Sequence, residues 1–146
     1  MGVYFDSAYL VKCYLSDPDS EQVRKVFIRA GTVSSSALCL AEVACAAHRA
    51  VREKSITAAQ AADVRLVFAS HIRGGIIVLI PVSDAILDAV QSFVATLPPN
   101  TFLRAGDAVH LASAQLEGFA EIWSNDRHML KAASHFGLAG RSVQKL

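Results

Sequence analysis

The chain has 146 residues, of which 53% are hydrophobic and 18% charged, and its formal net charge is +1. This length and composition predict one globular domain spanning residues 1–146, and they exclude both a disordered chain and a protein with a strong overall basic field. No apolar run reaches the ~20 residues of a membrane span. Three cysteines without metal-binding spacing are typical of free thiols in the cytoplasm.

The first half of the chain alternates apolar runs with helical periodicity. The aromatic and β-branched run at residues 2–5 predicts a strand, and the turn at 17–20 separates the two helices that follow it. Gly31 ends the second of these helices before another strand begins. We therefore expect strands at 2–5 and 32–36, and helices at 7–15, 21–30, 37–54 and 57–73.

The second half continues this alternation. Its uninterrupted apolar run at 76–80 predicts a strand buried on both faces. We expect helices at 83–97, 107–117 and 127–136, and strands at 76–80, 120–126 and, at an edge of the sheet, 140–143. Strands that alternate with helices favour an α/β fold, in which a parallel sheet is covered on both faces.

Four acidic residues lie where such a fold brings distant segments together. Asp6 and Asp126 directly follow predicted strands, at the carboxyl ends where parallel sheets bind their ligands. Glu42 lies in the second turn of the helix that follows the strand at 32–36, and Asp107 opens a helix after a loop. Because helices that follow parallel strands begin at this same edge, the four acids can share one cleft.

Simpler roles exist for each acid. Each of the three aspartates precedes a helical run, so each can cap that helix, a contribution of ~1 kcal/mol. Glu42 can belong to a polar stripe with Arg49 and Glu53 on one face of its helix. Such roles do not explain why all four acids fall at one edge of the sheet, so capping and a shared acidic site both remain open at this point.

The chain also resembles a known family. Four segments resemble the signature segments of PIN-domain ribonucleases, specifically the VapC-type toxins of toxin–antitoxin pairs: "VYFDSAYLVKCYL", "LAEVACA", "LRAGDAVHLASA" and "IWSNDRHML". The resemblance spans nearly the whole chain and implies a three-layer α/β/α sandwich around a central, mainly parallel sheet of four to five strands. It implies six site residues: the metal-site acids Asp6, Glu42, Asp107 and Asp126, and the supporting hydroxyls of Ser7 and Ser124.

The resemblance also implies a separate role in metal binding for each acid. Asp6 and Asp107 would be direct metal ligands, Asp126 a direct or water-mediated ligand, and Glu42 would orient a water or hold a second ion. An oxygen-only set without a histidine–cysteine pattern favours Mg²⁺ or Mn²⁺ over zinc. Such ions neutralise a phosphodiester and activate water. The expected activity is a metal-dependent endoribonuclease that cuts single-stranded or looped RNA.

Two further residues have expected roles, and two other functions are compatible with an α/β fold. Arg104 is expected to contact the substrate backbone, and His110 is expected to be packed in the core rather than to face the cleft. One alternative is a non-catalytic PIN-like interaction module. Another is a phosphoryl-transfer α/β enzyme with a nucleophilic aspartate. This chemistry needs a second acid beside the nucleophile and a lysine at the same edge, but Asp6 is followed by Ser7 and Ala8 and no lysine stands at an obvious strand end.

The resemblance implies protein partners as well. Helical segments 37–51 and 57–72 are rich in alanine and sparsely charged, so an exposed groove between them is one reading and plain core packing is the other. The resemblance implies that a small antitoxin docks in this region and blocks the acidic cleft. It further implies that the protein is a homodimer.

Overall fold

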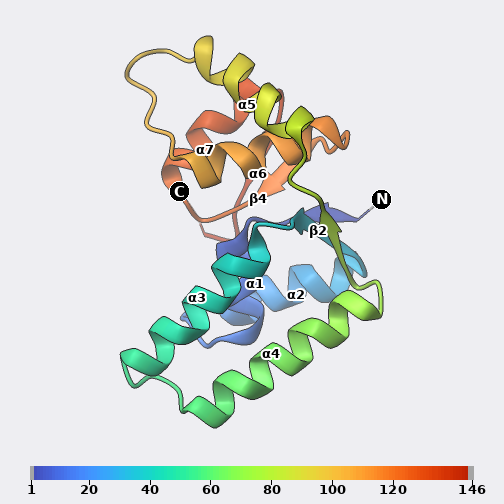
Figure 1. The fold of residues 1–146 in the computed structure, drawn as a ribbon, viewed down its shortest axis with the longest axis vertical. Coiled ribbons are helices and arrows are strands. Elements are labelled where there is room, and N and C mark those ends of the chain that lie inside the picture. The colour runs from blue at the N-terminus through green and yellow to red at the C-terminus, as the bar shows by residue number, and fades with distance from the viewer. Residues whose placement is uncertain (1, 145–146) are drawn as a thin grey trace.

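The structure, a computed structural model, describes residues 2–144 and contains five short parallel strands (Figure 1). They are β1 (Val3–Tyr4), β2 (Val33–Ser36), β3 (Ile77–Ile80), β4 (Glu121–Trp123) and β5 (Ala139–Arg141). Strands β1, β2 and β3 pair in that order, and β4 pairs with β5. A parallel bridge between Phe5 and Trp123 joins the two sheets. The spatial order is therefore β3-β2-β1-β4-β5, which confirms the mainly parallel sheet.

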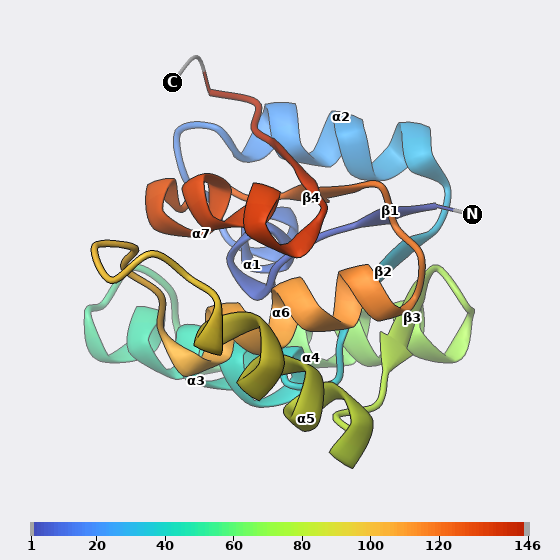
Figure 2. The same ribbon diagram turned by 90° about the horizontal axis from the view of Figure 1, so that it is seen from above.

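Helices cover both faces of these strands. They are α1 (Ser7–Tyr14), α2 (Ser20–Ala30), α3 (Cys39–Arg52), α4 (Ala58–Arg73), α5 (Asp84–Ala95), α6 (Ala105–Leu116) and α7 (Arg127–Ala132), the last followed by the 3₁₀ turn η1 (Ala133–Phe136). Figure 1 shows α5, α6 and α7 above the strands and α1 to α4 below them, and Figure 2, seen from above, shows α6 crossing in front of α3 and α4. The predicted three-layer α/β/α sandwich is confirmed.

Two neighbouring residues of the first strand segment show how the core is divided. Successive side chains of a strand point to opposite faces. Tyr4 accordingly packs into a cluster with Leu111, Ile122 and other residues of the upper helices. Phe5 packs into a second cluster that draws on α1 to α4. Each face of the sheet therefore has its own buried apolar layer.

The strand at 76–80 is less buried than the sequence predicts. Strand β3 has only one neighbour, β2, so it forms an edge of the sheet. Ile77 and Ile80 are buried, but Val78 is 42% exposed. The prediction of burial on both faces is wrong here, because an uninterrupted apolar run cannot distinguish a central strand from an edge strand with one open face.

The last strand lies at Ala139–Arg141, slightly earlier than predicted, and it packs closely against α7. A Cβ atom on Gly140 would lie 2.8 Å from Leu130 Cδ2 and 3.2 Å from the Leu130 backbone. Only glycine allows this approach without displacing α7. Within residues 2–144, none of the helices is both long and apolar enough to cross a membrane.

The chain leaves adjacent strands toward opposite faces at one point of the sheet. After β1 it enters α1, whose Tyr9 and Leu10 belong to the lower cluster. After β4 it enters α7, whose Met129 and Ala132 belong to the upper cluster. Such a switch opens a crevice at the carboxyl ends of the two strands, which is where open α/β sheets bind ligands.

Candidate active site

Two aspartates at this crevice begin helices. Asp6 precedes α1, and its Oδ1 accepts a hydrogen bond from the Tyr9 backbone N–H at 2.8 Å. Asp126 precedes α7, and its Oδ1 accepts from the backbone N–H groups of His128 and Met129 at 2.8 and 3.0 Å. Both aspartates are therefore helix caps, and each keeps a second carboxylate oxygen for another partner.

Ser124 connects the two aspartates. Its Oγ donates to Asp6 Oδ2 at 2.6 Å and accepts from the backbone N–H of Asp126 at 2.9 Å. Both Asp6 and Ser124 are buried. The hydroxyl therefore holds the residues that follow β1 and β4 together at the switch point of the sheet.

Asp107 is not a helix cap. It is the third residue of α6, whose N-cap is Arg104, and no side chain caps this helix. The capping alternative is therefore wrong for Asp107. Its Oδ2 instead accepts from Arg104 Nε at 3.2 Å, while Arg104 Nη2 donates to Asp126 Oδ2, also at 3.2 Å. Arg104, which the sequence suggested as a substrate contact, bridges two of the four acids although its side chain is 64% exposed.

Glu42 belongs to the same edge rather than to a polar stripe on α3. Its Oε1 accepts from Ser7 Oγ at 2.8 Å and lies 3.0 Å from His110 Nε2. Arg49 pairs with Glu53 instead, at 2.8 Å. The stripe interpretation is wrong because Glu42 faces α1 and α6, not the solvent-exposed ion pair at the far end of its own helix.

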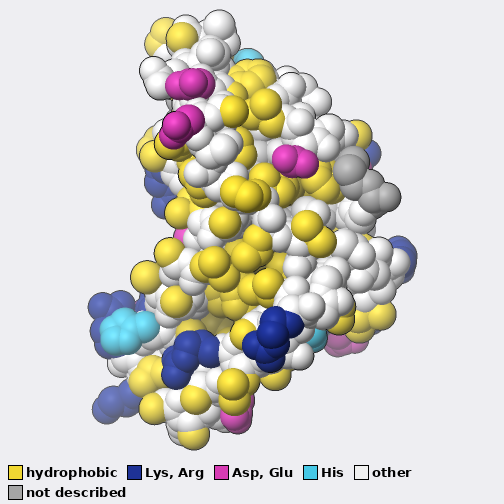
Figure 3. Space-filling view, turned by 45° about the vertical axis from the view of Figure 1, so that its right-hand side comes forward, with side chains coloured by type: hydrophobic (Ala, Val, Ile, Leu, Met, Phe, Trp, Pro, Cys, Tyr) yellow, Lys and Arg dark blue, Asp and Glu magenta, His cyan; other side chains and the backbone are white. Residues whose placement is uncertain are grey.

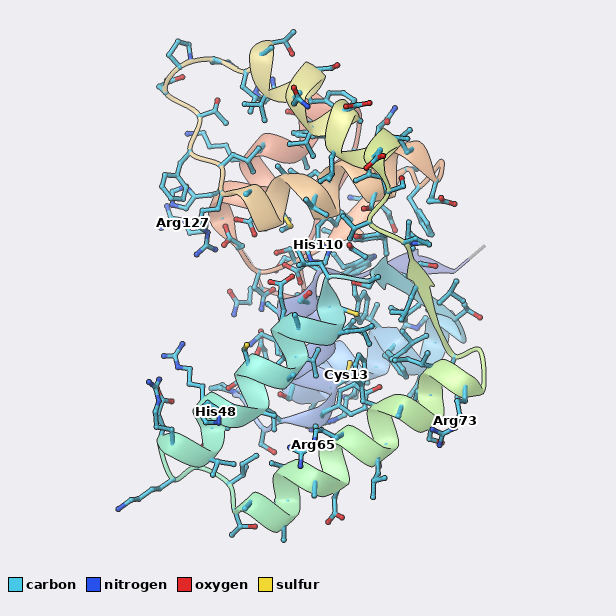
Figure 4. The ribbon with its side chains drawn as sticks, in the orientation of Figure 1. Cys13, His48, Arg65, Arg73, His110 and Arg127 are labelled. Carbon is cyan, nitrogen blue, oxygen red and sulfur yellow. The ribbon has the colours of Figure 1, made fainter. Side chains whose placement is uncertain are left out.

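His110 is both a core residue and the partner of Glu42. It is 1% exposed, and its Nδ1 lies 2.9 Å from the hydroxyl of Tyr4, which accepts the Ser36 backbone N–H at 3.0 Å. The Tyr4 proton is therefore available to Nδ1, which leaves the imidazole hydrogen on Nε2, facing Glu42 and Ser7. Figure 4 shows His110 at the centre of the molecule, where α6 meets α3.

The sequence predicted that His110 is packed but did not reveal these bonds. Its position three residues after Asp107 placed it on a helix of the site. Nothing in the sequence pointed to Tyr4, which lies 106 positions away from His110 in the chain.

The acids differ in how well their charges are stabilised. Burial raises the pKa of Asp6 to about 6, although the bonds from Ser124 and Tyr9 lower it in part. Burial also raises the pKa of Asp107, more than the neighbouring Arg104 lowers it. For Glu42, burial is outweighed by the hydrogen bonds from His110 and Ser7, and its pKa lies below the usual range. Asp6 and Asp107 therefore lack sufficient positive charge nearby, which a bound cation could supply.

The side chains of the four acids can be compared with the ligands that a divalent metal ion prefers. All four acids offer hard oxygen donors, which suit Mg²⁺ or Mn²⁺. In the part of the chain that the structure describes, however, no three acidic, histidine or cysteine side chains form a group that could hold one ion. Arg104 lies against Asp107 and Asp126, and Glu42 turns toward His110. The chemistry of the donors therefore fits a divalent cation, while these side chains are engaged with other partners in the structure.

A second polar cluster, which we call the Asn125 network, lies beside the acids. Asn125 hydrogen-bonds Asp19 and accepts from the Tyr9 hydroxyl at 2.9 Å. Asp19 also pairs with Lys12 at 2.7 Å, and Gln144 Nε2 donates to Asp19 at 3.1 Å. Sequence reasoning missed this network, since its members come from separate segments with no recognisable spacing.

Two adjoining cavities lie along α1. One of about 370 Å³ is lined by Ser7 and Glu42, and the other, of about 770 Å³, lies between α1, α3 and α4. Val11 and Ala46 line both cavities. The helix pair α3 and α4 thus borders an open groove together with α1, and Glu42 is the candidate acid that this groove reaches.

Comparison with known proteins identifies the family to which this fold belongs. The model of the PIN domain family matches residues 3–134. The fold is similar to the crystal structure of VapBC2 from Rickettsia felis bound to a DNA fragment from their promoter, with a TM-score of 0.68 and 16% identity over 96% of this chain and 98% of that chain. No curated protein matches the sequence. With its matching fold and a family match that covers most of its length, the chain belongs to the PIN domain family.

Proposed function

We propose that this protein is a metal-dependent endoribonuclease and the toxin of a VapBC-type toxin–antitoxin pair. PIN domains are generally nucleases. The observation that carries the proposal is Asp6: a buried carboxyl group whose pKa is raised to about 6, linked through Ser124 to Asp126 at the switch point of the sheet. A helix cap needs no such burial, whereas acids poised around a cation often have perturbed pKa values.

Asp6, Asp107 and Asp126 would hold Mg²⁺ or Mn²⁺, with Glu42 orienting a water or holding a second ion. When bound, the ion neutralises the phosphodiester and makes hydroxide available at neutral pH. The rotamer of Asp6 is fixed by the N–H of Tyr9 and the hydroxyl of Ser124. Such supporting bonds orient ligands before the ion arrives.

Arg104 then has a second role. Asp107 and Asp126 would exchange their ion pairs with Arg104 for a bound cation, and the exposed Arg104 side chain would then be able to turn outward. An arginine released beside the cleft can bind phosphate oxygens with two parallel hydrogen bonds. This reconciles the ion pairs in the structure with the substrate contact expected from the sequence.

The test is cleavage of a labelled single-stranded RNA by the purified protein. We expect cleavage in Mg²⁺ or Mn²⁺, none in excess chelator, and recovery when the ion is restored. Calorimetry with each ion adds a second measurement. Cleavage that survives exhaustive chelation contradicts the metal role, and the absence of any ion binding favours a non-catalytic interaction module.

We also propose the partners. The groove of about 770 Å³ combines apolar residues such as Val11 and Val64 with charged residues such as Arg49 and Asp63, and it suits an antitoxin segment that ends beside Glu42. The similarity of the fold to that of VapBC2 supports this assignment. Co-expression with the cognate antitoxin should inhibit cleavage, and protection of groove amides from hydrogen exchange should locate its segment.

Exposed hydrophobic side chains support self-association into a homodimer. Figure 3 shows hydrophobic side chains gathered in a band across one side of the molecule. Exposed residues from several elements include Leu40 on α3, Leu66 on α4, Val78 on β3 and Leu87 on α5. We propose that residues 1–146 form a single domain that pairs with a second copy in the cytoplasm. Sedimentation should report a dimer, and a monomer at high concentration contradicts this.

A further inference from the structure

An exposed aromatic pair lies beside the acids. The rings of Phe102 and His128 have centroids 4.4 Å apart and are inclined by 46°. Phe102 is 54% exposed, and it is the one aromatic residue among the large exposed hydrophobic residues within 2–144. Single exposed aliphatic residues are common on protein surfaces. An exposed phenylalanine packed beside a tilted imidazole ring is a different feature, because it offers an aromatic surface to solvent.

Both rings are attached to segments that carry the acids. Phe102 lies two residues before Arg104, which bonds Asp107 and Asp126. The backbone N–H of His128 donates to Asp126 at 2.8 Å. The pair is therefore placed by the same contacts that fix the candidate catalytic edge.

The preceding loop is restrained as well. Pro98 and Pro99 limit its backbone torsions, and Thr101 N–H donates to the Pro98 carbonyl at 2.9 Å. These restraints limit the backbone that leads to Phe102, which reduces the conformational freedom lost when a base stacks on its ring.

Cationic side chains flank the pair. Arg104 is largely exposed, and Arg127, next to His128, is also exposed. Figure 4 shows Arg127 on the side of the molecule where the loop before α6 passes the start of α7. Aromatic rings for bases beside cations for phosphates are the combination by which proteins hold single-stranded nucleic acid.

We propose that Phe102 and His128 form a stacking platform for one nucleobase of a single-stranded RNA, next to the phosphodiester at the acidic edge. The inference rests on the proposed function only in taking RNA as the ligand. The aromatic face supplies affinity and position, and it accepts any base, since each has a planar ring.

The experiment measures binding of a short fluorescent single-stranded RNA in Mg²⁺, with Asp6→Asn in every protein to keep the RNA intact. Three variants are compared with the parent protein, which carries Phe102. Phe102→Trp keeps an aromatic face, whereas Phe102→Leu and Phe102→Ala lose it. We expect Phe102→Trp to bind at least as tightly as the parent. Phe102→Leu and Phe102→Ala should each lose about tenfold in affinity, the effect of one stacked base.

A matched control and a matched RNA sharpen this test. Ile28→Ala, at a residue 77% exposed on α2, should leave the affinity unchanged. The test is repeated with a series of RNAs, each with one abasic site at a different position. For one RNA of the series, the parent protein and Phe102→Leu should bind with equal affinity, because the base that stacks on Phe102 is missing. A penalty that persists for every abasic RNA, or equal binding of all four proteins to intact RNA, overturns the platform.

The outcomes also separate this inference from the proposed function. If the wild type cleaves RNA and Phe102→Leu cleaves and binds equally well, the platform fails and the nuclease stands. If the wild type cleaves nothing while binding still depends on Phe102 and on one base, the nuclease fails and the platform stands. Absence of RNA binding overturns the platform, as does a Phe102→Leu variant that changes only self-association, which would mark a protein contact.

Discussion

Ser124 and Asn125 are neighbours after β4, yet their side chains join polar clusters of opposite electrostatic character. Ser124 donates to Asp6, whose pKa burial raises to about 6. Asn125 joins Asp19. Partial burial opposes ionisation of Asp19, but the hydrogen bond and charge of Lys12 outweigh it and hold the pKa of Asp19 below its usual range. The same residue type at the same edge is destabilised as an anion in one cluster and stabilised in the other.

The two clusters differ in whether they contain a buried cation of their own, and the proposed function assigns catalysis to the one that does not. The Asn125 network contains its own cation, Lys12, whose side chain is largely buried. The acidic edge has Arg104, whose guanidinium is exposed and can leave. A carboxylate left short of positive charge costs stability, and proteins retain such groups at sites of function. The comparison therefore predicts opposite responses to the same substitution in the two clusters.

The largest expected difference is in activity. Asp6→Asn should reduce the rate of RNA cleavage by about 100- to 1000-fold, the loss typical of removing a group that stabilises charge in an active site. Asp19→Asn should retain the rate within about twofold, because Asp19 lies in the Asn125 network. Initial rates in Mg²⁺ measure both, and expression in a bacterial host should arrest growth only for the wild type and Asp19→Asn. Equal losses for the two variants would remove the distinction between the clusters.

The next effect concerns stability and its dependence on pH. Folded Asp6 holds its proton up to about pH 6 and an unfolded aspartate only to about pH 4, so this group makes stability fall as pH rises through that window. Asp6→Asn keeps the cap and removes the buried charge. It should raise the free energy of unfolding of the metal-free protein at pH 8 by up to about 3 kcal/mol.

Urea unfolding with chelator at pH 4 and pH 8 measures this effect. Most of the gain at pH 8 should disappear near pH 4, where the wild-type carboxyl group is protonated in the folded state and about half protonated in the unfolded state. Asp19 has the opposite sign: its contribution is present above about pH 4 and is lost as pH falls further. A gain of equal size at both pH values would show that burial of charge is not the cause.

A smaller effect tests the support of Glu42. His110→Ala removes the donor at Glu42 Oε1 and should weaken Mn²⁺ binding about tenfold, as is usual for partners that orient metal ligands. His110→Gln places an amide N–H near the position of Nε2 and should recover most of the affinity. Calorimetry measures both variants at matched folded fractions. Identical affinities for the alanine and glutamine variants would limit His110 to core packing.

The smallest effect lies in the Asn125 network. Asp19→Asn removes the ion pair with Lys12, whose two side chains are largely buried, and should lower the free energy of unfolding by about 1 kcal/mol at pH 7. Urea unfolding in chelator gives this value beside that of Asp6→Asn. A stabilising result would place the network among the functional acids.

The sequence predicted which acids lie at the edge of the sheet better than it predicted the hydrogen bonds between side chains of the site. An acid directly after a strand, such as Asp6 or Asp126, is placed by local periodicity and parallel topology alone. The bond between His110 and Glu42 joins residues 68 positions apart and depends on rotamers in a packed core. No local pattern encodes it.

The errors have similar physical causes. Asp107 looked like a cap because it precedes the helical run that starts at Ala108, but the helix begins at Ala105, so the carboxyl group lies inside the first turn. Strand β3 looked central because its residues are apolar throughout, and that pattern is equally compatible with an edge. Both errors concern the position of a residue or strand relative to neighbouring elements. The sequence of a single segment does not contain this information.

The absence of a side chain at Gly140 has a consequence for the tolerances of the site. A Cβ atom there would lie 2.8 Å from Leu130 Cδ2 and 3.2 Å from the Leu130 backbone, and α7 begins at the residue that follows Asp126. A residue larger than glycine would displace the Leu130 side chain and press on the backbone of the helix that Asp126 caps. Gly140 contributes no chemistry, yet a substitution at this position acts on the helix that begins at the candidate site.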